Sequence, residues 1–300
     1  MTLFDMSNGT EKSPKRRQGT NQPERLHNIT CLYCSCMITD ANTTKEHVIA
    51  RNFVPKGYFE NAWNLIANAC ERCNSDKGDL EDDISAILMM PLLGHNEDRP
   101  DDVIQQGLKK SRGSLSRKTS KPIIDSEHRS EISNTFGRAK LSFGFVAPPQ
   151  IDDSRVDALA EYHITALFYL LTYDAESQRG RFWTEGFEVI HSARSPDWGN
   201  PIHVGFSSSV KSWPSWFKGS LARGYFKALI RKKPDEDIFA WALEWNKTMR
   251  VIGVFGETQL TIPFIDNLPN LEFVQVSATR HYRRETPLDP KEDYLFFVQE

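Results

Sequence analysis

Cysteine is scarce in this sequence and absent beyond position 73. Five cysteines in 300 residues, all near the start of the chain, cannot staple the whole fold with disulfides. Cysteines gathered in one short stretch favour a metal site in a reducing compartment instead. We therefore expect a cytoplasmic protein with a local metal centre.

The sequence also lacks a long apolar run. The longest candidates, ISAILMMPLL and ITALFYLLTY, fall short of the roughly 18 residues of a membrane span and contain proline or polar residues. No apolar core follows the basic residues near the N-terminus, so a secretory signal is not expected. A hydrophobic content of 39% and a charged content of 26% fit a soluble globular protein without a membrane partner.

Neither sign of charge is in strong excess. A formal net charge of −3 does not mark the whole chain as a nucleic-acid binder, so local basic patches must carry that case. The best candidate is KKSRGSLSRKTSK, residues 109–121, with six basic residues and no acidic one. The alternative is that this segment is a solvated, mobile linker.

The chain divides into four expected segments. Residues 1–26 are polar and basic and predict a disordered arm. Residues 27–84 hold all the cysteines and predict a compact unit, with a helix after Cys73 capped by Asn74 or Asp76. Residues 85–150 look like a loop-rich connector. Residues 151–300 are expected to fold as a separate C-terminal domain, since 300 residues suffice for about two domains.

The C-terminal segment predicts an α+β domain with a mainly antiparallel sheet. The clearest helix covers residues 152–173, with Asp153 or Ser154 as its cap and His163 on its apolar face, where a core histidine is expected. Short turns separate segments with strand-like alternation, which are residues 186–193, 201–207, 225–232, 238–246, 250–256 and 259–264. Trp213, Trp216 and Phe217 favour core packing over stacking on bases.

The cysteines form two matched pairs, Cys31-x-x-Cys34 and Cys70-x-x-Cys73. Two such pairs can complete a tetrahedral zinc shell of four thiolates. A unit of fewer than about 60 residues buries little core, so a structural zinc would compensate. The alternatives are two unrelated buried pairs or a redox CxxC. Cys36 has no partner in this pattern and is expected to be a small buried side chain.

Further motifs lie between and after these pairs, namely Glu46-His47-Val48-Ile49, Asn64-Leu65 and Asn74-x-x-Lys77. With the cysteines, and in this order, they resemble the HNH nuclease family and its ββα-metal fold. The resemblance covers about residues 29–80. It implies a metal-dependent endonuclease that hydrolyses the phosphodiester bonds of DNA.

The resemblance also implies individual roles. His47 would be the general base, since imidazole has an ordinary pKa near ~6.5. Glu46 and Asn74 would bind a catalytic Mg²⁺ or Mn²⁺, and Asn64 would fix the loop that orients His47. Some relatives carry another histidine where Gly78 stands, which leaves this metal shell thin. Neighbouring strand residues point to opposite faces, so Glu46 and His47 can share one phosphate only if the strand is irregular.

Each assignment has a structural alternative. His47 could be a half-buried strand histidine, Glu46 a solvated strand edge, and Asn64 and Asn74 turn or helix caps. Lys77 could contact phosphate or be a solvated lysine. The candidate nucleic-acid contacts are Lys77, Lys109, Lys110, Arg112, Arg117 and Lys118.

Two functions therefore follow from the sequence. The first is a metal-dependent HNH endonuclease acting on DNA. The second is a zinc-stabilised nucleic-acid-binding module without catalysis. By analogy alone, a nuclease joined to an unfamiliar C-terminal domain suggests a bacterial defence effector. That domain would then contact a protein partner or a second copy of the chain.

Overall fold

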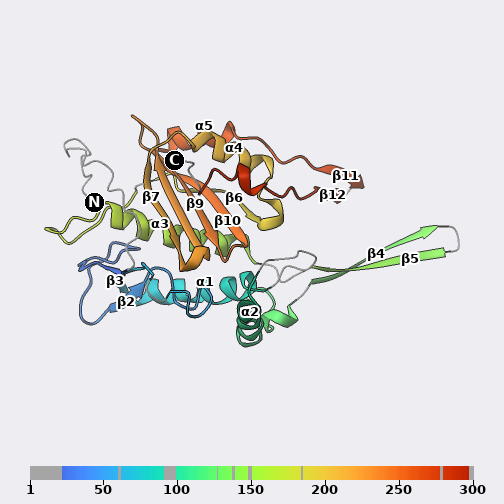
Figure 1. Cartoon of the computed structure of the whole chain (residues 1–300), viewed down its shortest axis with the longest axis horizontal. Helices are drawn as coiled ribbons and strands as arrows, with labels where there is room; N and C mark the ends of the chain where they lie inside the picture. Colours follow the sequence, from blue (N-terminus) through green and yellow to red (C-terminus); the bar gives the residue numbers. More distant parts are fainter. Residues whose placement is uncertain are drawn as a thin grey trace.

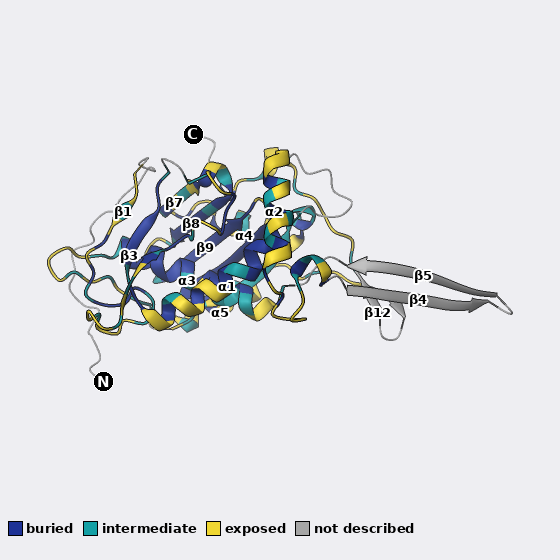
Figure 2. Ribbon diagram, turned by 90° about the horizontal axis from the view of Figure 1, so that it is seen from below, coloured by how far each residue is buried: buried dark blue, intermediate teal, exposed yellow. Residues whose placement is uncertain are grey.

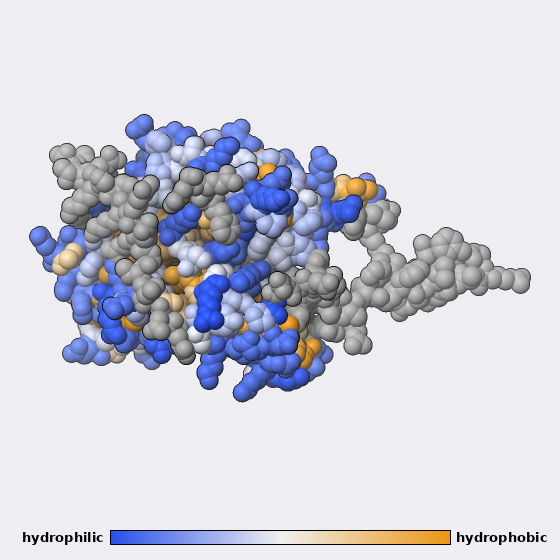
Figure 3. Space-filling view, in the orientation of Figure 1, coloured by the Kyte–Doolittle hydropathy of each residue, from blue (hydrophilic) through white to orange (hydrophobic). Residues whose placement is uncertain are grey.

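The chain forms an α+β structure in stacked layers, as the sequence predicts (Figure 1). The computed structural model describes residues 22–59, 62–90, 99–126, 128–136, 139–147, 151–183, 185–277 and 280–296. Among the helices in these ranges, none has the length and apolar character needed to cross a membrane. The face seen in Figure 3 is mainly hydrophilic, with apolar side chains in small separate areas.

A five-stranded antiparallel sheet forms the centre of the molecule, with strand order β6-β10-β9-β8-β7. The strands are β6 (Glu188–Arg194), β7 (Ser215–Leu221), β8 (Phe226–Lys232), β9 (Ile238–Trp245) and β10 (Met249–Gly256). Strands predicted at 186–193, 225–232, 238–246 and 250–256 are confirmed with small shifts. β7 was not predicted, since its sequence SWFKGSL contains a glycine and two serines.

Strand β9 is buried along its whole length because both faces of the sheet are covered (Figure 2). Trp241 and Trp245 face the core shared with helix α3 (Asp153–Leu171). Ala240 and Ala242 face the other side, under helices α4 (Pro201–Val210) and α5 (Thr258–Asp266). A strand covered on both faces carries apolar residues without strict alternation.

Two segments expected as strands are helices. Residues 201–207 lie in α4, where the Asn200 side chain accepts a hydrogen bond from His203 N–H at 3.0 Å and Pro201 occupies the first turn. Residues 259–264 lie in α5. The apolar residues that cover the sheet are four apart in both segments, as in Phe206–Val210 and Leu260–Phe264. That helical spacing outweighs the strand-like alternation on which the strand prediction depends.

Helix α3 is confirmed, and it is the central helix of the molecule. Its cap is Asp152, whose side chain accepts from Ser154 N–H at 3.1 Å, and neither Asp153 nor Ser154 caps it. On one side its Phe168 packs against Phe239 of the sheet. On the other side Tyr162 packs edge-on against Tyr33. The helix therefore lies between the sheet and the N-terminal segment (Figure 1).

One hydrophobic core runs through the segments expected to be separate. The same buried cluster joins Leu32, Phe53 and Ile84 to Leu167 and Trp245. Asn246 donates to the Phe53 carbonyl at 2.9 Å and Thr248 to the Leu88 carbonyl at 3.1 Å. The boundaries drawn at residues 84 and 151 therefore do not coincide with a break in the core.

The N-terminal sheet has the strand order β1-β3-β2, with β1 (Glu24–Arg25), β2 (Thr43–His47) and β3 (Leu65–Cys70). β2 is antiparallel and β1 parallel to β3. Helix α1 (Glu71–Leu88) follows β3 directly, so it begins before Cys73, and neither Asn74 nor Asp76 caps it. Of the expected arm, residues 24–26 belong to this unit, and residues 1–21 lie outside the described residues.

The expected loop-rich connector contains regular elements. They are helix α2 (Asp101–Gly113) and the hairpin of β4 (His128–Phe136) and β5 (Ala139–Ala147). A further strand pair, β11 (Val274–Ser277) and β12 (Arg280–Tyr282), belongs to the C-terminal segment. Helix α2 packs on α1, and a Cβ at Gly107 would clash with the Met89 carbonyl, so this close approach requires glycine. The β4–β5 hairpin extends away from the body of the molecule (Figure 1).

Candidate functional site

The cysteines converge from two places in the chain. In the CLYCSC turn, Ser35 N–H donates to the Cys31 carbonyl at 3.0 Å, and Cys31 N–H donates to the Cys36 carbonyl at 2.8 Å. Ser35 takes a left-handed conformation, with φ of 60°, which tightens the turn. Cys70 ends β3 and Cys73 lies in the first turn of α1. The backbone therefore fixes both groups of thiols.

Four thiols form a group suited to a metal ion. The Sγ atoms of Cys31, Cys34, Cys36 and Cys70 all lie within 4.8 Å of one another. Cys34 Sγ and Cys70 Sγ are 3.7 Å apart. Tetrahedral zinc with Zn–S bonds of about 2.3 Å places sulfur atoms about 3.8 Å apart. The described residues thus fit a structural zinc ion.

The membership of this group differs from the prediction. Cys36, expected to be buried and unpartnered, is exposed and belongs to the group because the CLYCSC turn carries it there. Cys73 is buried, yet it is outside the mutually close set. Burial raises the pKa of Cys70, but hydrogen bonds from the Cys73 backbone and the neighbouring thiols outweigh it and lower the pKa to about 7.

His47 lies at the end of β2 in a cationic setting. It pairs across the sheet with Ile66, which in turn pairs with Arg25 of β1, so the three residues form one row. Burial lowers the pKa of His47, and the positive charges of Arg51, Lys45 and Arg25 lower it further. The imidazole is therefore neutral at pH 7 and can accept a proton.

Asn64 holds the segment that follows His47. Its side chain is buried, donates to the Ile49 carbonyl at 2.8 Å and accepts from Ile49 N–H at 3.3 Å. This reciprocal pair fixes the backbone two residues beyond His47. Asn64 is thus placed where it can orient the His47 imidazole, which is the role that the resemblance implies.

Glu46 points away from His47. The pairing of β2 with β3 continues without a bulge from Thr43 to His47, so adjacent side chains alternate between the two faces. The irregular strand required for a shared phosphate is therefore not found. Glu46 is 3% exposed, so the alternative of a solvated strand edge is wrong as well.

A buried charge network occupies the Glu46 face. Lys77 is 1% exposed, and its Nζ lies 2.9 Å from Glu46 Oε1 and 2.8 Å from Glu81 Oε1. Tyr33 donates its hydroxyl to Glu46 Oε1 at 2.8 Å. His163 Nε2 is 3.5 Å from Glu81 Oε1. Lys77 is therefore neither solvated nor free to contact phosphate, which corrects both readings of this residue.

The protonation states follow from this network. Burial alone lowers the pKa of Lys77, but the carboxylates of Glu81 and Glu46 together raise it above its ordinary value. Burial raises the pKa of Glu46 more than Lys77 and Tyr33 lower it. Burial lowers the pKa of His163 to about 4, so this histidine is neutral. The Lys77 ammonium offsets the free-energy cost of burying the carboxylates of Glu46 and Glu81.

A catalytic cation does not fit Glu46 in this arrangement. Asn74 donates its amide to Thr44 Oγ1 at 3.1 Å, so it lies on the same side of β2 as Glu46. Carboxylate and amide oxygens suit Mg²⁺, but the Glu46 carboxylate already holds an ammonium and a phenol. Apart from the cysteines, the described residues contain no group of three His, Cys, Asp or Glu side chains positioned to ligate a metal.

The basic run at 109–121 is partly helical and partly engaged. Lys109, Lys110 and Arg112 lie in the last turns of α2 rather than in a loop. Lys110 Nζ donates to the Asn52 carbonyl and Ser85 Oγ, each at 2.5 Å, and burial lowers its pKa to about 8. Arg117 forms an ion pair with Asp79 on α1.

Four of the basic candidates are exposed, namely Lys109, Arg112, Arg117 and Lys118. Of these, Arg117 is the one in the ion pair with Asp79. Lys110 instead links α2 to α1, because its ammonium is hydrogen-bonded to Ser85. This contact corrects its assignment as a nucleic-acid contact. The partner Glu81 was missed by sequence reasoning, although its spacing of four from Lys77 is a recognised helical ion-pair signal.

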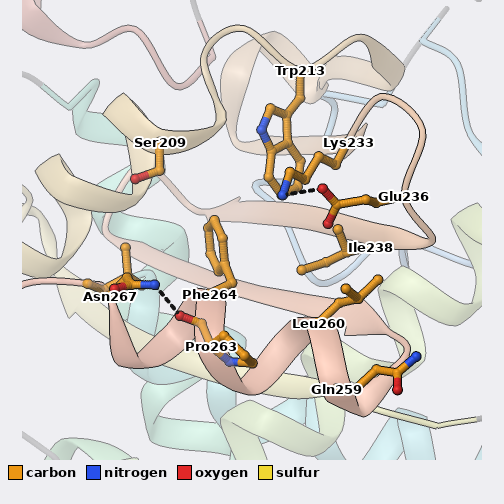
Figure 4. Close-up of a pocket in the computed structure, with 11 residues that line it drawn as sticks. Ser209, Trp213, Lys233, Glu236, Ile238, Gln259, Leu260, Pro263, Phe264 and Asn267 are labelled. Carbon is orange, nitrogen blue, oxygen red and sulfur yellow. Dashed lines mark hydrogen bonds and ion pairs between the residues drawn. The ribbon is translucent and has the colours of Figure 1, made fainter.

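A separate pocket lies on the far side of the central sheet, between α4 and α5 (Figure 4). Its volume is about 450 Å³, and Trp213 and Phe264 supply its aromatic wall. The Lys233–Glu236 ion pair, 2.6 Å long, forms part of the rim. Trp213 and Phe217 are buried, as core packing predicts. The sheet separates this pocket from His47 and the cysteines.

Comparisons with protein-family models, with curated proteins and with solved structures found no match to this chain. The HNH resemblance therefore depends on the motifs within residues 29–80 alone.

Proposed function

We propose that the chain is a nuclease that hydrolyses phosphodiester bonds in DNA, with His47 as the general base. The observation that carries the proposal is a neutral, half-exposed imidazole among Arg25, Lys45 and Arg51. A phosphodiester is an anion, so this cationic setting attracts it to the same place as the base. Asn64 supports the geometry by fixing the backbone beyond His47.

In this proposal His47 removes a proton from a water molecule, and the resulting hydroxide attacks phosphorus. The P–O bond to the 3′ oxygen breaks, that oxygen takes up a proton from solvent, and His47 returns its own proton to solvent. The products are 5′-phosphate and 3′-hydroxyl ends. Arg25, Lys45 and Arg51 stabilise the negative charge that develops on the phosphate oxygens. Because Glu46 is paired with Lys77, no step is assigned to a divalent cation.

The cysteine group has a structural role in the same proposal. Zinc bound there would join the CLYCSC turn to the junction of β3 and α1, which bounds the unit that carries His47. Such a link contributes folding free energy to a small unit.

A non-catalytic nucleic-acid-binding module is the second candidate. The observation that favours it is the Lys77 ammonium, 2.9 Å from the carboxylate that the HNH resemblance assigns to the catalytic cation. A binding module would retain the cationic surface and the zinc without needing a metal at Glu46. The two candidates differ in the expected effect of replacing His47. A nuclease would lose cleavage, whereas a binding module would lose at most some local DNA affinity.

A plasmid-nicking assay with the full chain separates them. His47→Ala is expected to lower the cleavage rate about 10²–10⁴-fold, the range for loss of a general base, with zinc content and DNA affinity retained. His27→Ala is the matched control, since His27 is an exposed histidine of the same unit. Wild-type activity should rise with pH through a pKa below 6.5, as expected for a base of lowered pKa. No His47-dependent cleavage, with or without added Mg²⁺ or Mn²⁺, would favour the binding module.

A further inference from the structure

Five thiols gather where a tetrahedral zinc ion takes four. Cys31, Cys34 and Cys70 belong to the mutually close group, and Cys36 completes it within 4.8 Å. Cys73 is buried in the first turn of α1, three residues beyond Cys70, and is not a member of that group. Beside Cys31, Cys34 and Cys70, two cysteines can therefore be considered for the fourth position: Cys36 by its place in the group and Cys73 by its CxxC spacing.

Both competitors are held by fixed backbone. The carbonyl of Cys36 accepts from Cys31 N–H at 2.8 Å, which closes the turn that carries the first pair. Cys73 lies in the first turn of α1, three residues after Cys70 ends β3. The backbone of both residues therefore has a defined position beside the other three cysteines.

We infer that Cys36 and Cys73 are alternative fourth ligands of one zinc ion, whose other ligands are Cys31, Cys34 and Cys70. Exchange between them conserves atoms and charge, because the incoming thiol releases one proton and the departing thiolate takes one up. The two ligands differ in environment, since Cys36 is exposed and Cys73 is buried. The fourth position thus opens either toward solvent or toward the interior.

The inference rests on the proposed structural zinc and is independent of hydrolysis. It predicts that the site tolerates the loss of either competitor and not the loss of a shared ligand. Loss of one thiolate from a four-thiolate site should weaken zinc binding at least as much as loss of a supporting side chain, which costs about 10–100-fold.

The test uses the full chain with Co²⁺ in place of zinc, because thiolate-to-cobalt charge-transfer absorbance reports the number of bound thiolates. Cys36→Ser and Cys73→Ser should each keep the four-thiolate spectrum, with zinc affinity within about tenfold of wild type. The double variant should show a three-thiolate spectrum and weaker binding. Cys31→Ser is the control for loss of a shared ligand, and circular dichroism checks the fold of each variant.

The single variants decide the inference. If Cys73→Ser alone loses a thiolate or fails to fold while Cys36→Ser is silent, the fourth ligand is fixed at Cys73. The reverse result fixes it at Cys36, and either result overturns the exchange. A wild-type chain that binds neither zinc nor cobalt would overturn the structural metal itself and would leave the proposed hydrolysis to be judged by its own assay.

Discussion

At the scale of single residues, the two proposed functions require different behaviour of Lys77. Its ammonium lies between Glu46 and Glu81, at 2.9 and 2.8 Å, inside the protein. A divalent cation at Glu46 would have to displace it. If Lys77 has only a structural role, its ammonium remains between the two carboxylates. Its contribution to stability and its response to metal are therefore informative about function.

Lys77→Met should destabilise the fold by about 3–5 kcal/mol, the cost of removing one partner from a buried ion pair. The reason is that the carboxylates of Glu46 and Glu81 would remain buried without the ammonium. The measurement is the free energy of unfolding in urea. Lys109→Met is the matched control, because Lys109 is exposed on α2 and should change this free energy by less than about 0.5 kcal/mol.

A small effect of Lys77→Met would mean that the ammonium leaves the interior easily. In that case wild-type protein should bind Mn²⁺ in a manner that Glu46→Gln abolishes. Such binding would restore the catalytic cation of the HNH resemblance. Large destabilisation together with no Glu46-dependent Mn²⁺ binding would keep Glu46 as a structural partner.

His163 gives a pH-dependent prediction. The imidazole is fully buried among the rings of Phe53, Phe226 and Trp245, and burial lowers its pKa to about 4. An unfolded chain protonates this histidine near its ordinary pKa of about 6.5. Between these values the unfolded state binds the additional proton, so stability is full above pH 6.5 and falls as the pH drops toward 4.

The slope is about 1.4 kcal/mol per pH unit for one proton, or about 2 kcal/mol lost from pH 6.5 to pH 5. His163→Leu should flatten the pH dependence of the unfolding free energy by this amount. Its effect is isolated because His203, whose pKa burial lowers to about 3, contributes with the same sign in both proteins. An unchanged slope in the variant would show that His163 becomes protonated without unfolding.

At the scale of elements, the sequence predicts what local pattern controls. The paired CxxC motifs, the position of Asn64 and the strands β8, β9 and β10 depend on spacings within short segments. Segments 201–207 and 259–264 were misassigned because strand-like residues and helical spacing coexist in them, and contact with the sheet decides the outcome. Propensity is a weak guide where tertiary packing supplies most of the stability.

Contacts between distant elements could not be read from the sequence. Lys77 looked solvated because the carboxylate that it meets on β2 is 31 positions away. The sequence around Tyr33 does not predict its hydrogen bond to Glu46. Cys36 looked unpartnered because its place in the thiol group depends on how the CLYCSC turn meets β3. Each of these side chains acquires its role from topology.

At the scale of the whole molecule, α3 joins what the sequence divides. His163 of this helix reaches Glu81 of α1, and Phe53 packs edge-on against Trp245 of the sheet. A helix buried on two sides exposes a large apolar face if one side is removed. The candidate catalytic unit and the C-terminal sheet should therefore unfold together, although composition and length predict two domains.

The last prediction tests this shared core. A fragment of residues 151–300 should lack a cooperative urea transition, because α3 would expose the apolar residues that pack on residues 26–88. Tryptophan fluorescence reports this fragment well, since every tryptophan except Trp63 lies beyond residue 180. Adding residues 1–126 as a second fragment should restore the transition, whereas the same fragment carrying Phe53→Asp should not, since Phe53 is fully buried against Trp245 and His163. Cooperative unfolding of the isolated 151–300 fragment at full-chain stability would instead establish two independent domains.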